Sequence, residues 1–242
     1  IHGVPTDITV ENRTGGCGVA VVWSTVTTTD CTFSALDVDH PSGSEFSIGT
    51  TLVTYTATDT EGNQTTASFL VTVEDVEAPV LTNLPADIEV MAAVGSCEAT
   101  ASWLEPSATD CISYELSSDW PSGASFPIGQ TLVTYTATDP SGNTSSASFT
   151  ITVLDQEQPA IEGLPEIVQV DTTAGSCLGV ATWTEPTGSD CSGISSLVPD
   201  QPSGTDFPVG STEVTYTAID GSGNTSTASF TVTVVDSESP VI

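Results

Sequence analysis

The chain has 242 residues, and its 32 acidic residues stand against a single basic one, which gives a formal net charge of −31 at pH 7. A surface this acidic offers nothing to neutralise phosphates, so the composition excludes nucleic acid and anionic membranes as partners. No apolar stretch has the length of a bilayer span, so we expect no membrane insertion. The near absence of Lys and Arg leaves trypsin-like proteases little to cut, which favours an extracellular, secreted or cell-surface location.

One sequence unit is repeated three times. Its period of 80 residues is set by three landmarks: Cys17, Cys97 and Cys177; Cys31, Cys111 and Cys191; and Trp23, Trp103 and Trp183. A period this long is a small domain rather than a solenoid unit, so we expect modules at 1–79, 80–159 and 160–242. Because the chain ends at the phase of the repeat where it starts, we interpret it as a segment of a longer array.

In the first copy, a short strand is expected at residues 7–10, after a proline. A Gly-rich turn leads to a second strand that runs through Trp23, and a weaker strand is expected around residues 33–38. A turn follows at Asp39–Gly43. No stretch shows the 3.6-residue period of an amphipathic helix.

Residues 50–79 recur most closely in all three copies and read as a hairpin. Val53, Tyr55 and Ala57 alternate with threonines, which is the period of a half-buried strand. Turn residues follow at 59–63, and apolar residues then alternate again up to an acidic exit that ends in a proline. Six or seven short strands per module predict an all-β chain of three tandem β-sandwich modules.

The cysteines indicate an oxidising environment. Each copy has two, separated by 13 residues, and the spacing lacks the close pairs of a zinc site. We therefore expect one disulfide inside each module, and closing a loop of about 15 residues is worth roughly 3 kcal/mol. The predicted bridges are Cys17–Cys31, Cys97–Cys111 and Cys177–Cys191.

These landmarks resemble the hyalin repeat (HYR) domain, an immunoglobulin-like β-sandwich module of extracellular proteins. The motifs that carry the resemblance are Pro85-Ala86-Asp87-Ile88, Gly95-Ser96-Cys97, Glu105-Pro106, Ala108-Thr109-Asp110-Cys111, Pro121-Ser122-Gly123, Phe126-Pro127-Ile128-Gly129 and Val133–Asp139 with Gly142-Asn143. The first copy departs from them at Thr25-Val26, where the others have Glu-Pro. The resemblance implies immunoglobulin-like modules with a cell-adhesive or matrix role, a link to calcium, and no enzymatic activity.

The residues themselves also argue against catalysis. The only histidines, His2 and His40, occur in the first copy, so no repeated site contains a histidine base. The three repeated tryptophans, Trp23, Trp103 and Trp183, lie on the apolar face of a strand and are expected in the core rather than against a sugar ring.

We expect calcium at the junctions between modules. In an immunoglobulin-like sandwich the last strand leaves at the end opposite the final hairpin turn, so the acidic exit of one module meets the loop and turn of the next. Carboxylates gathered in this way suit a hard cation with six to eight oxygen ligands. The expected ligands are Asp75, Glu77, Asp110 and Asp139 at the first junction, and Asp155, Glu157, Asp190 and Asp220 at the second. The alternative is that Asp139 only caps its own turn and that each exit is a solvated linker.

Two classes of function follow. In the first, the chain is part of a stalk, matrix fibre or filament, its partners are further copies of the same module, and calcium rigidifies a rod on the order of 100 Å long. In the alternative, the chain is an adhesin that recognises a glycan or a cell-surface protein through variable loops at His40, Trp120 and Gln201.

The chain also contains glycosylation sequons. Asn12, Asn63, Asn143 and Asn224 are each followed by Ser or Thr at the second position, and the last three occupy the same hairpin turn.

Overall fold

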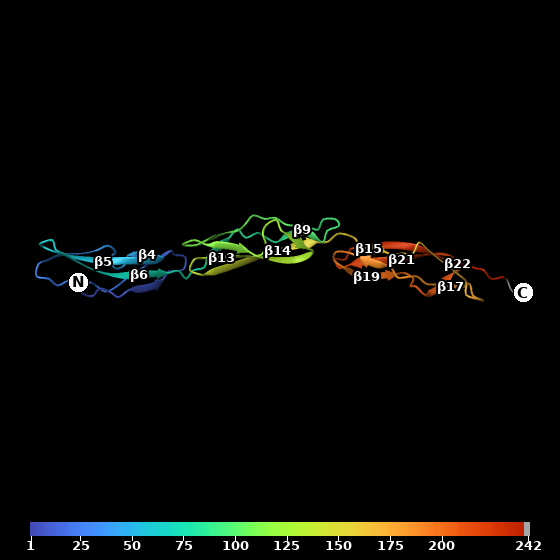
Figure 1. Ribbon diagram of the computed structural model, residues 1–242, viewed down its shortest axis with the longest axis horizontal. Helices are drawn as coiled ribbons and strands as arrows, with labels where there is room; N and C mark the ends of the chain where they lie inside the picture. Colours follow the sequence, from blue (N-terminus) through green and yellow to red (C-terminus); the bar gives the residue numbers. More distant parts are fainter. Residues whose placement is uncertain (240–242) are drawn as a thin grey trace. The chain divides into compact units, whose positions relative to one another are not determined.

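The computed structural model describes residues 1–239, and these residues form strands, turns and loops without a helix. None of them therefore provides a helix that could cross a membrane. The prediction of an all-β chain with three repeated sandwich-like modules is confirmed (Figure 1). Residues 240–242, the last of the predicted third module, lie outside the described residues.

The strands repeat from one module to the next. The first repeat contains β1 (Ile8–Glu11), β2 (Gly18–Ala20), β3 (Phe33–Val38), β4 (Glu45–Ser47), β5 (Gly49–Asp59) and β6 (Gln64–Glu74). The second contains β7 (Val80–Thr82), β8 (Ile88–Met91), β9 (Glu98–Thr100), β10 (Ser107–Thr109), β11 (Glu115–Ser118), β12 (Ser125–Pro127), β13 (Gly129–Thr138) and β14 (Thr144–Leu154). The third contains β15 (Ala160–Glu162), β16 (Ile167–Asp171), β17 (Leu178–Ala181), β18 (Thr187–Ser189), β19 (Ile194–Pro199), β20 (Thr205–Pro208), β21 (Gly210–Asp220) and β22 (Thr225–Val235).

The predicted hairpin is the centre of each repeat. β5 and β6 pair antiparallel from Gly49 opposite Val73 to Thr58 opposite Gln64. Val53 and Val71 are fully buried and face the same core because side chains alternate along a strand. The two strands are joined by a tight turn in which Gly62 takes a positive φ of 83°, a conformation that suits glycine.

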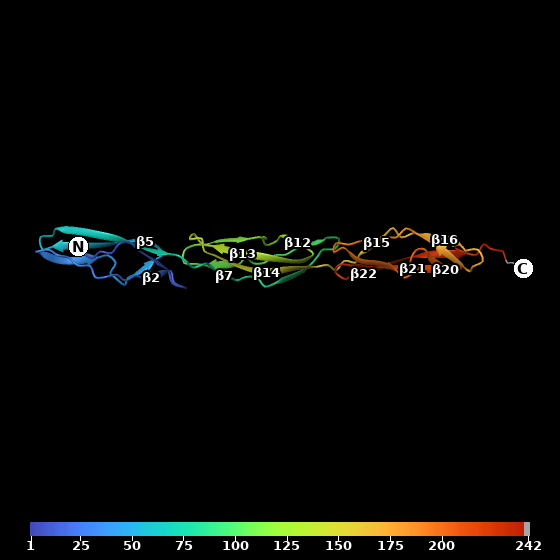
Figure 2. The same ribbon diagram turned by 90° about the horizontal axis from the view of Figure 1, so that it is seen from below.

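Each repeat has the same two-layer arrangement. A four-stranded sheet has the order β1-β6-β5-β3, with β1 and β6 parallel, and a two-stranded sheet, β2-β4, lies against it. In the third repeat the order is β16-β22-β21-β19, and β16 lies beside the hairpin in Figure 2. Phe46 on β4 packs into the same core as Phe69 on β6, so the two layers share one apolar interior.

The repeated tryptophans, Trp23, Trp103 and Trp183, pack against this interior, as predicted. The indole of Trp23 packs edge-on against Phe69, with ring centroids 5.1 Å apart, and its Nε1 donates to the Tyr55 hydroxyl at 2.9 Å. Trp183 repeats this contact by donating to Tyr216 at 2.8 Å. A buried tryptophan N–H requires such an acceptor.

The second strand is shorter than expected. It ends at Ala20, whereas the pattern predicted a strand through Trp23. Val21 instead forms backbone hydrogen bonds with Gly43 and Ser44 in the facing turn. The backbone N–H of Trp23 donates to the Ser42 hydroxyl at 2.9 Å. The partner strand β4 begins only at Glu45, so the ladder has no strand opposite residues 21–23.

The predicted pairing of the cysteines is wrong. The structure contains none of the expected bridges Cys17–Cys31, Cys97–Cys111 or Cys177–Cys191. It joins Cys17 to Cys111 and Cys97 to Cys191, each over 94 residues and with Cα atoms 5.1 Å apart. Cys31 and Cys177 are exposed and free within the described part of the chain.

The physical reason is the position of the two cysteines within a repeat. Cys17 follows a Gly-rich turn whose Gly15 N–H donates to Glu77, so it lies at the end where the chain leaves the repeat. Cys31 is next to Thr32, whose carbonyl accepts from Thr60 in the hairpin turn at the opposite end. A disulfide requires Cα atoms within about 7 Å, so Cys17 and Cys97 each form a bridge across a junction, to Cys111 and Cys191, instead of within their own repeat.

The backbone contacts divide the chain into two compact units. The first comprises Ile1–Pro85, Leu104–Pro121 and Val133–Phe149, and the second comprises Ala86–Trp103, Ser122–Leu132 and Thr150–Ile242. Each junction between consecutive repeats therefore lies wholly inside one unit.

Candidate metal centres at the module junctions

The exit of the first repeat is held in a fixed conformation by its own module. Asp75 follows β6, and its Oδ1 accepts from the Asn12 amide at 3.0 Å and from the Glu77 N–H at 3.2 Å. Asn12 in turn accepts the Val76 N–H at 3.1 Å. These bonds occupy Oδ1 of Asp75 and leave its Oδ2 without a hydrogen-bond partner.

The first junction gathers carboxylates from both of its repeats. Asp75 from the exit meets Asp110 from the loop after β10 and Asp139 from the hairpin turn, and one oxygen from each lies within 4.8 Å of the others. Asp75 is only 8% exposed and Asp139 only 5%. The Oδ2 atoms of Asp75 and Asp110 are buried without a hydrogen-bond partner. Buried charges need a compensating partner, so this arrangement is incomplete as a purely structural feature.

Hydrogen bonds position the hairpin turn for this cluster. The side chain of Asp139 accepts the Asn143 N–H at 2.9 Å and the Asn143 amide at 2.8 Å. Burial raises the pKa of Asp139, but these hydrogen bonds lower it overall and so favour the charged form. The same Asn143 amide donates to the backbone carbonyl of Asp75 at 3.1 Å, which ties the turn of one repeat to the exit of the other.

The second junction repeats this geometry with Asp155, Asp190 and Asp220, whose oxygens also lie within 4.8 Å of one another. Asp220 is 1% exposed, and the Oδ2 of Asp155 is buried without a hydrogen-bond partner. Burial raises the pKa of Asp155, but the nearby Ser192 hydroxyl and the Glu157 N–H lower it overall. The Asn224 amide donates to the Asp155 carbonyl at 3.3 Å, as Asn143 does at the first junction.

The structure places two of the predicted ligands outside these clusters. Glu77 accepts the Gly15 N–H at 2.7 Å, and Glu157 accepts the Gly95 N–H at 2.8 Å. Each glutamate thus fixes its exit against the Gly-rich turn of its own repeat. Six of the eight predicted ligands are brought together, and these two position the exit.

Residues that the sequence reasoning missed complete each junction. Ser145 donates from its hydroxyl to the Pro79 carbonyl, and Ser226 donates to the Pro159 carbonyl. With the asparagines of the hairpin turns, they hold the backbone of one exit against the next repeat. A hydroxyl residue two positions after the turn asparagine occurs in every copy, and this was the signal available in the sequence.

The sequon asparagines are largely engaged in these bonds. Asn12 is 7% exposed and donates to Asp75, and the amides of Asn143 and Asn224 donate at the junctions. A glycan on any of these three would displace such a bond. Asn63 is exposed, and glycosylation there stays a prediction.

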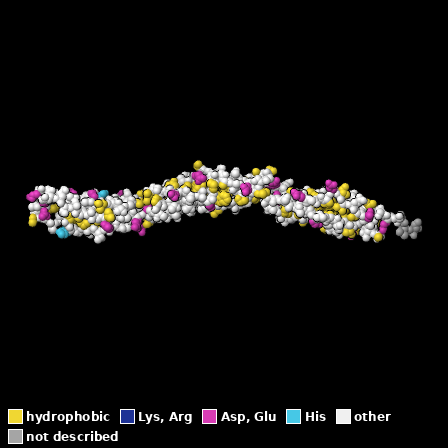
Figure 3. Space-filling model, viewed as in Figure 1, with side chains coloured by type: hydrophobic (Ala, Val, Ile, Leu, Met, Phe, Trp, Pro, Cys, Tyr) yellow, Lys and Arg dark blue, Asp and Glu magenta, His cyan; other side chains and the backbone are white. Residues whose placement is uncertain are grey.

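The variable loop residues have no distinctive exposed surface. His40, Trp120 and Gln201 are all half-buried, and the His40 ring lies 5.5 Å from the ring of Phe46 in its own module. Acidic side chains are spread over the visible face of each repeat rather than gathered in one patch (Figure 3).

Fold and site together define a class of protein: a tandem array of β-sandwich modules whose junctions gather carboxylates and are crossed by disulfides. The family model of the HYR domain matches residues 3–73, 74–153 and 154–234. The chain therefore belongs to the HYR domain family, and the resemblance seen in the sequence is confirmed. The module boundaries predicted at residues 79 and 159 stay predictions.

Curated relatives include two sea-urchin proteins. The chain is 38% identical over 255 residues to hyalin of Strongylocentrotus purpuratus, with 98% of this chain and 21% of that protein covered. It is 38% identical over 242 residues to hyalin of Lytechinus variegatus, with 96% of this chain and 46% of that protein covered. The chain thus spans less than half the length of either relative.

The solved structures that match the chain include cadherin repeats. Protocadherin gammaB7 EC3-6 is 13% identical with a TM-score of 0.39, and it covers 95% of this chain and 72% of that chain. Drosophila N-cadherin EC1-3 is 13% identical with a TM-score of 0.34, and it covers 97% of this chain and 99% of that chain.

Proposed function

We propose that this chain is an extracellular structural and adhesive repeat array whose junctions bind Ca²⁺. The observation that carries the proposal is the pair of equivalent three-aspartate clusters, each built from two consecutive repeats. In the first cluster a carboxylate oxygen of the 8%-exposed Asp75 is buried without a hydrogen-bond partner. A bound cation would supply the missing compensation.

The chemistry of the ligands favours calcium over other cations. Both clusters offer carboxylate oxygens alone, without histidine or cysteine, and hard cations select oxygen ligands. Calcium accepts irregular sets of six to eight oxygens, whereas magnesium demands a near-ideal octahedron. Water and backbone carbonyls would complete the shell around three aspartates.

Several observations support the extracellular role. Two disulfides cross the junctions, and such bonds persist in oxidising compartments. Two of the curated relatives are named hyalin, and the HYR family consists of adhesion modules without catalysis. A cation shared by two repeats would replace repulsion between carboxylates with common coordination, which would limit bending at the junction.

Calorimetric titration of Ca²⁺ into the chelator-treated chain tests the proposal. We expect two equivalent sites for the parent chain and one for Asp110→Asn. The control is Asp30→Asn, which changes the same loop position of the first repeat, where no carboxylate cluster lies among the described residues, and it should keep two sites. Small-angle scattering should show a larger maximum dimension with Ca²⁺ than with chelator. No measurable heat, or two sites in Asp110→Asn, would refute the proposal.

A further inference from the structure

Each junction disulfide includes the residue next to a ligand of the aspartate cluster. At the first junction Cys111 directly follows Asp110, and at the second Cys191 directly follows Asp190. Consecutive Cα atoms are about 3.8 Å apart, so each bridge holds the backbone beside one ligand. The bridge and the cluster are therefore parts of one local structure.

At the first junction the bridge connects Asp110 to the exit that carries Asp75. The Gly15 N–H donates to Glu77 at 2.7 Å, and the Glu77 N–H donates to Asp75 Oδ1 at 3.2 Å. Cys17 lies two residues after Gly15 and forms the bridge. A ring of covalent and hydrogen bonds thus joins two of the three ligands, and reduction of the disulfide opens it.

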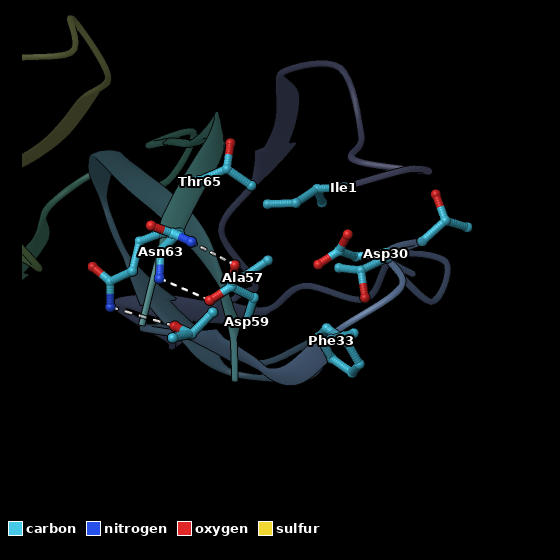
Figure 4. Close-up of a pocket in the computed structure, with 11 residues that line it drawn as sticks. Ile1, Asp30, Phe33, Ala57, Asp59, Asn63 and Thr65 are labelled. Atoms are coloured by element: carbon cyan, nitrogen blue, oxygen red, sulfur yellow. Dashed lines mark hydrogen bonds between the residues drawn. The ribbon is translucent and has the colours of Figure 1, made fainter. Parts of the chain in front are cut away.

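The hairpin ligand is held by its own turn instead. Asp139 accepts both the N–H and the side-chain amide of Asn143. In the first repeat Asp59 accepts the same two bonds from Asn63, both at 2.8 Å, in the turn drawn in Figure 4 beside a hollow of about 310 Å³. The third repeat has them as well, so this turn is a property of the repeat itself. The ligand that depends on the bridge is the one in the loop.

The two junctions differ in what else holds the loop ligand. At the second junction the N–H and the hydroxyl of Ser192 both donate to Asp190 Oδ1, each at 2.8 Å. At the first junction Ile112 occupies the position after the bridging cysteine, and its side chain has no donor. The Oδ2 of Asp110 is buried without a hydrogen-bond partner. Asp110 therefore depends on its bridge more than Asp190 does.

Both bridges are open to a small reductant. Cys17 and Cys97 are exposed. A hollow of about 230 Å³ is lined by Cys111, and one of about 350 Å³ is lined by Cys97 and Cys191. Because access is similar, a different response of the two junctions would come from their loops.

We propose that the Cys17–Cys111 disulfide makes calcium binding at the first junction redox-dependent, whereas the second junction keeps its affinity when its bridge is opened. This regulation rests on the proposed function, because it acts on the same sites. Once the bridge is reduced, binding has to order the loop that carries Asp110. Fixing the backbone of one residue lowers an equilibrium constant about five- to thirty-fold.

The covalent step is reduction by a thiol such as glutathione. Two glutathione molecules supply two electrons and two protons, the S–S bond breaks, both cysteines become thiols, and glutathione disulfide is released. Coupling between two equilibria is reciprocal, so calcium opposes this reduction by the factor by which reduction weakens calcium binding. A ten-fold effect corresponds to about 30 mV in the reduction potential of the bridge.

Paired substitutions that leave no new thiol test the proposal by calorimetric titration of Ca²⁺. Cys17→Ala with Cys111→Ala should weaken one of the two sites about ten-fold or more. The matched control is Cys97→Ala with Cys191→Ala, which removes the other bridge and should change neither site by more than about three-fold.

Exchanging the residue after the bridging cysteine separates the loop from the bridge. Ile112→Ser, added to the first pair of substitutions, should recover part of the lost affinity, because it supplies the hydroxyl that the second junction has. Ser192→Ala, added to the second pair, should weaken the second site, because Asp190 then loses both restraints.

The parent chain provides a measurement that needs no substitution. In a glutathione redox buffer, saturating Ca²⁺ should shift the Cys17–Cys111 equilibrium toward the disulfide about ten-fold or more, and the Cys97–Cys191 equilibrium by less than about three-fold. Differential alkylation and mass spectrometry measure each bridge separately. If the oxidised parent chain binds no Ca²⁺, the proposed function is refuted and this regulation with it. Calcium binding by the oxidised parent with equal shifts at both bridges, or with unchanged affinity in the first pair of substitutions, would overturn this regulation alone.

Discussion

Neutralising one carboxylate of a junction should stabilise the chain in chelator and reduce the stabilisation that calcium provides. Two unit charges 4.8 Å apart repel by about 3.5 kcal/mol at an effective dielectric constant of 20. Asp110→Asn removes two such pairs, and because solvent reaches Asp110, we expect a gain of only about 1–3 kcal/mol in chelator. With Ca²⁺ at 100 times its Kd, each site adds about 2.7 kcal/mol, so the variant should lose that amount of calcium stabilisation relative to the parent chain.

Urea denaturation with and without Ca²⁺ measures both effects, since urea is uncharged and leaves the repulsion unscreened. Asp30→Asn is the control, because Asp30 belongs to no three-carboxylate cluster among the described residues. The Cys31 N–H donates to the Asp30 side chain, and the side-chain carbonyl of an asparagine can accept the same hydrogen bond. A variant that is no more stable than the parent in chelator, or that gains as much from Ca²⁺, would refute the reasoning.

Two further predictions concern the modules. Mapping with an Asp- or Glu-specific protease under non-reducing conditions should find Cys17 linked to Cys111, and a Cys17–Cys31 peptide would contradict the structure. In the chain-entropy model, closing this loop of about 95 residues stabilises the folded chain by about 4.7 kcal/mol, compared with about 3 kcal/mol for a loop of about 15 residues. Burial, and then the charge and hydrogen bond of Glu185, raise the pKa of Tyr216 above its usual value of 10.0. The folded chain therefore keeps this proton longer than the unfolded chain, so stability should be fully present below pH 10 and fall as the pH rises further. Glu185→Gln should lower the pKa of Tyr216, measured from tyrosinate absorbance; an unchanged titration would exclude Glu185 as a cause.

The local structure could be predicted because it depends on neighbouring residues. Val53 and Tyr55 alternate with threonines, and period-two alternation determines which side chains enter the core of a sandwich. The convergence of Asp75, Asp110 and Asp139 was also predictable, since the last strand of a sandwich and its hairpin turn lie at opposite ends.

The predictions that were wrong depend on which end of the sandwich a residue occupies. Cys17 and Cys31 are close in sequence, yet β2 and residues 21–30 carry the chain between opposite ends of the module. Spacing alone therefore favoured a bridge that the fold prohibits. Glu77 was assigned to the metal because its partner, the Gly15 N–H, is a backbone group that a residue pattern does not reveal.

The two junction disulfides also change how the chain carries tension. Their loops overlap between Cys97 and Cys111, so a single cut anywhere between Cys17 and Cys191 leaves all the pieces covalently joined. A pull on the ends passes through both bridges and the short segment between them, and the rest of each loop bears no load. If both bridges are reduced, the two overlapping loops together can release roughly 500 Å of extra length. The local redox potential would thereby determine how far the chain can be extended before a covalent bond breaks.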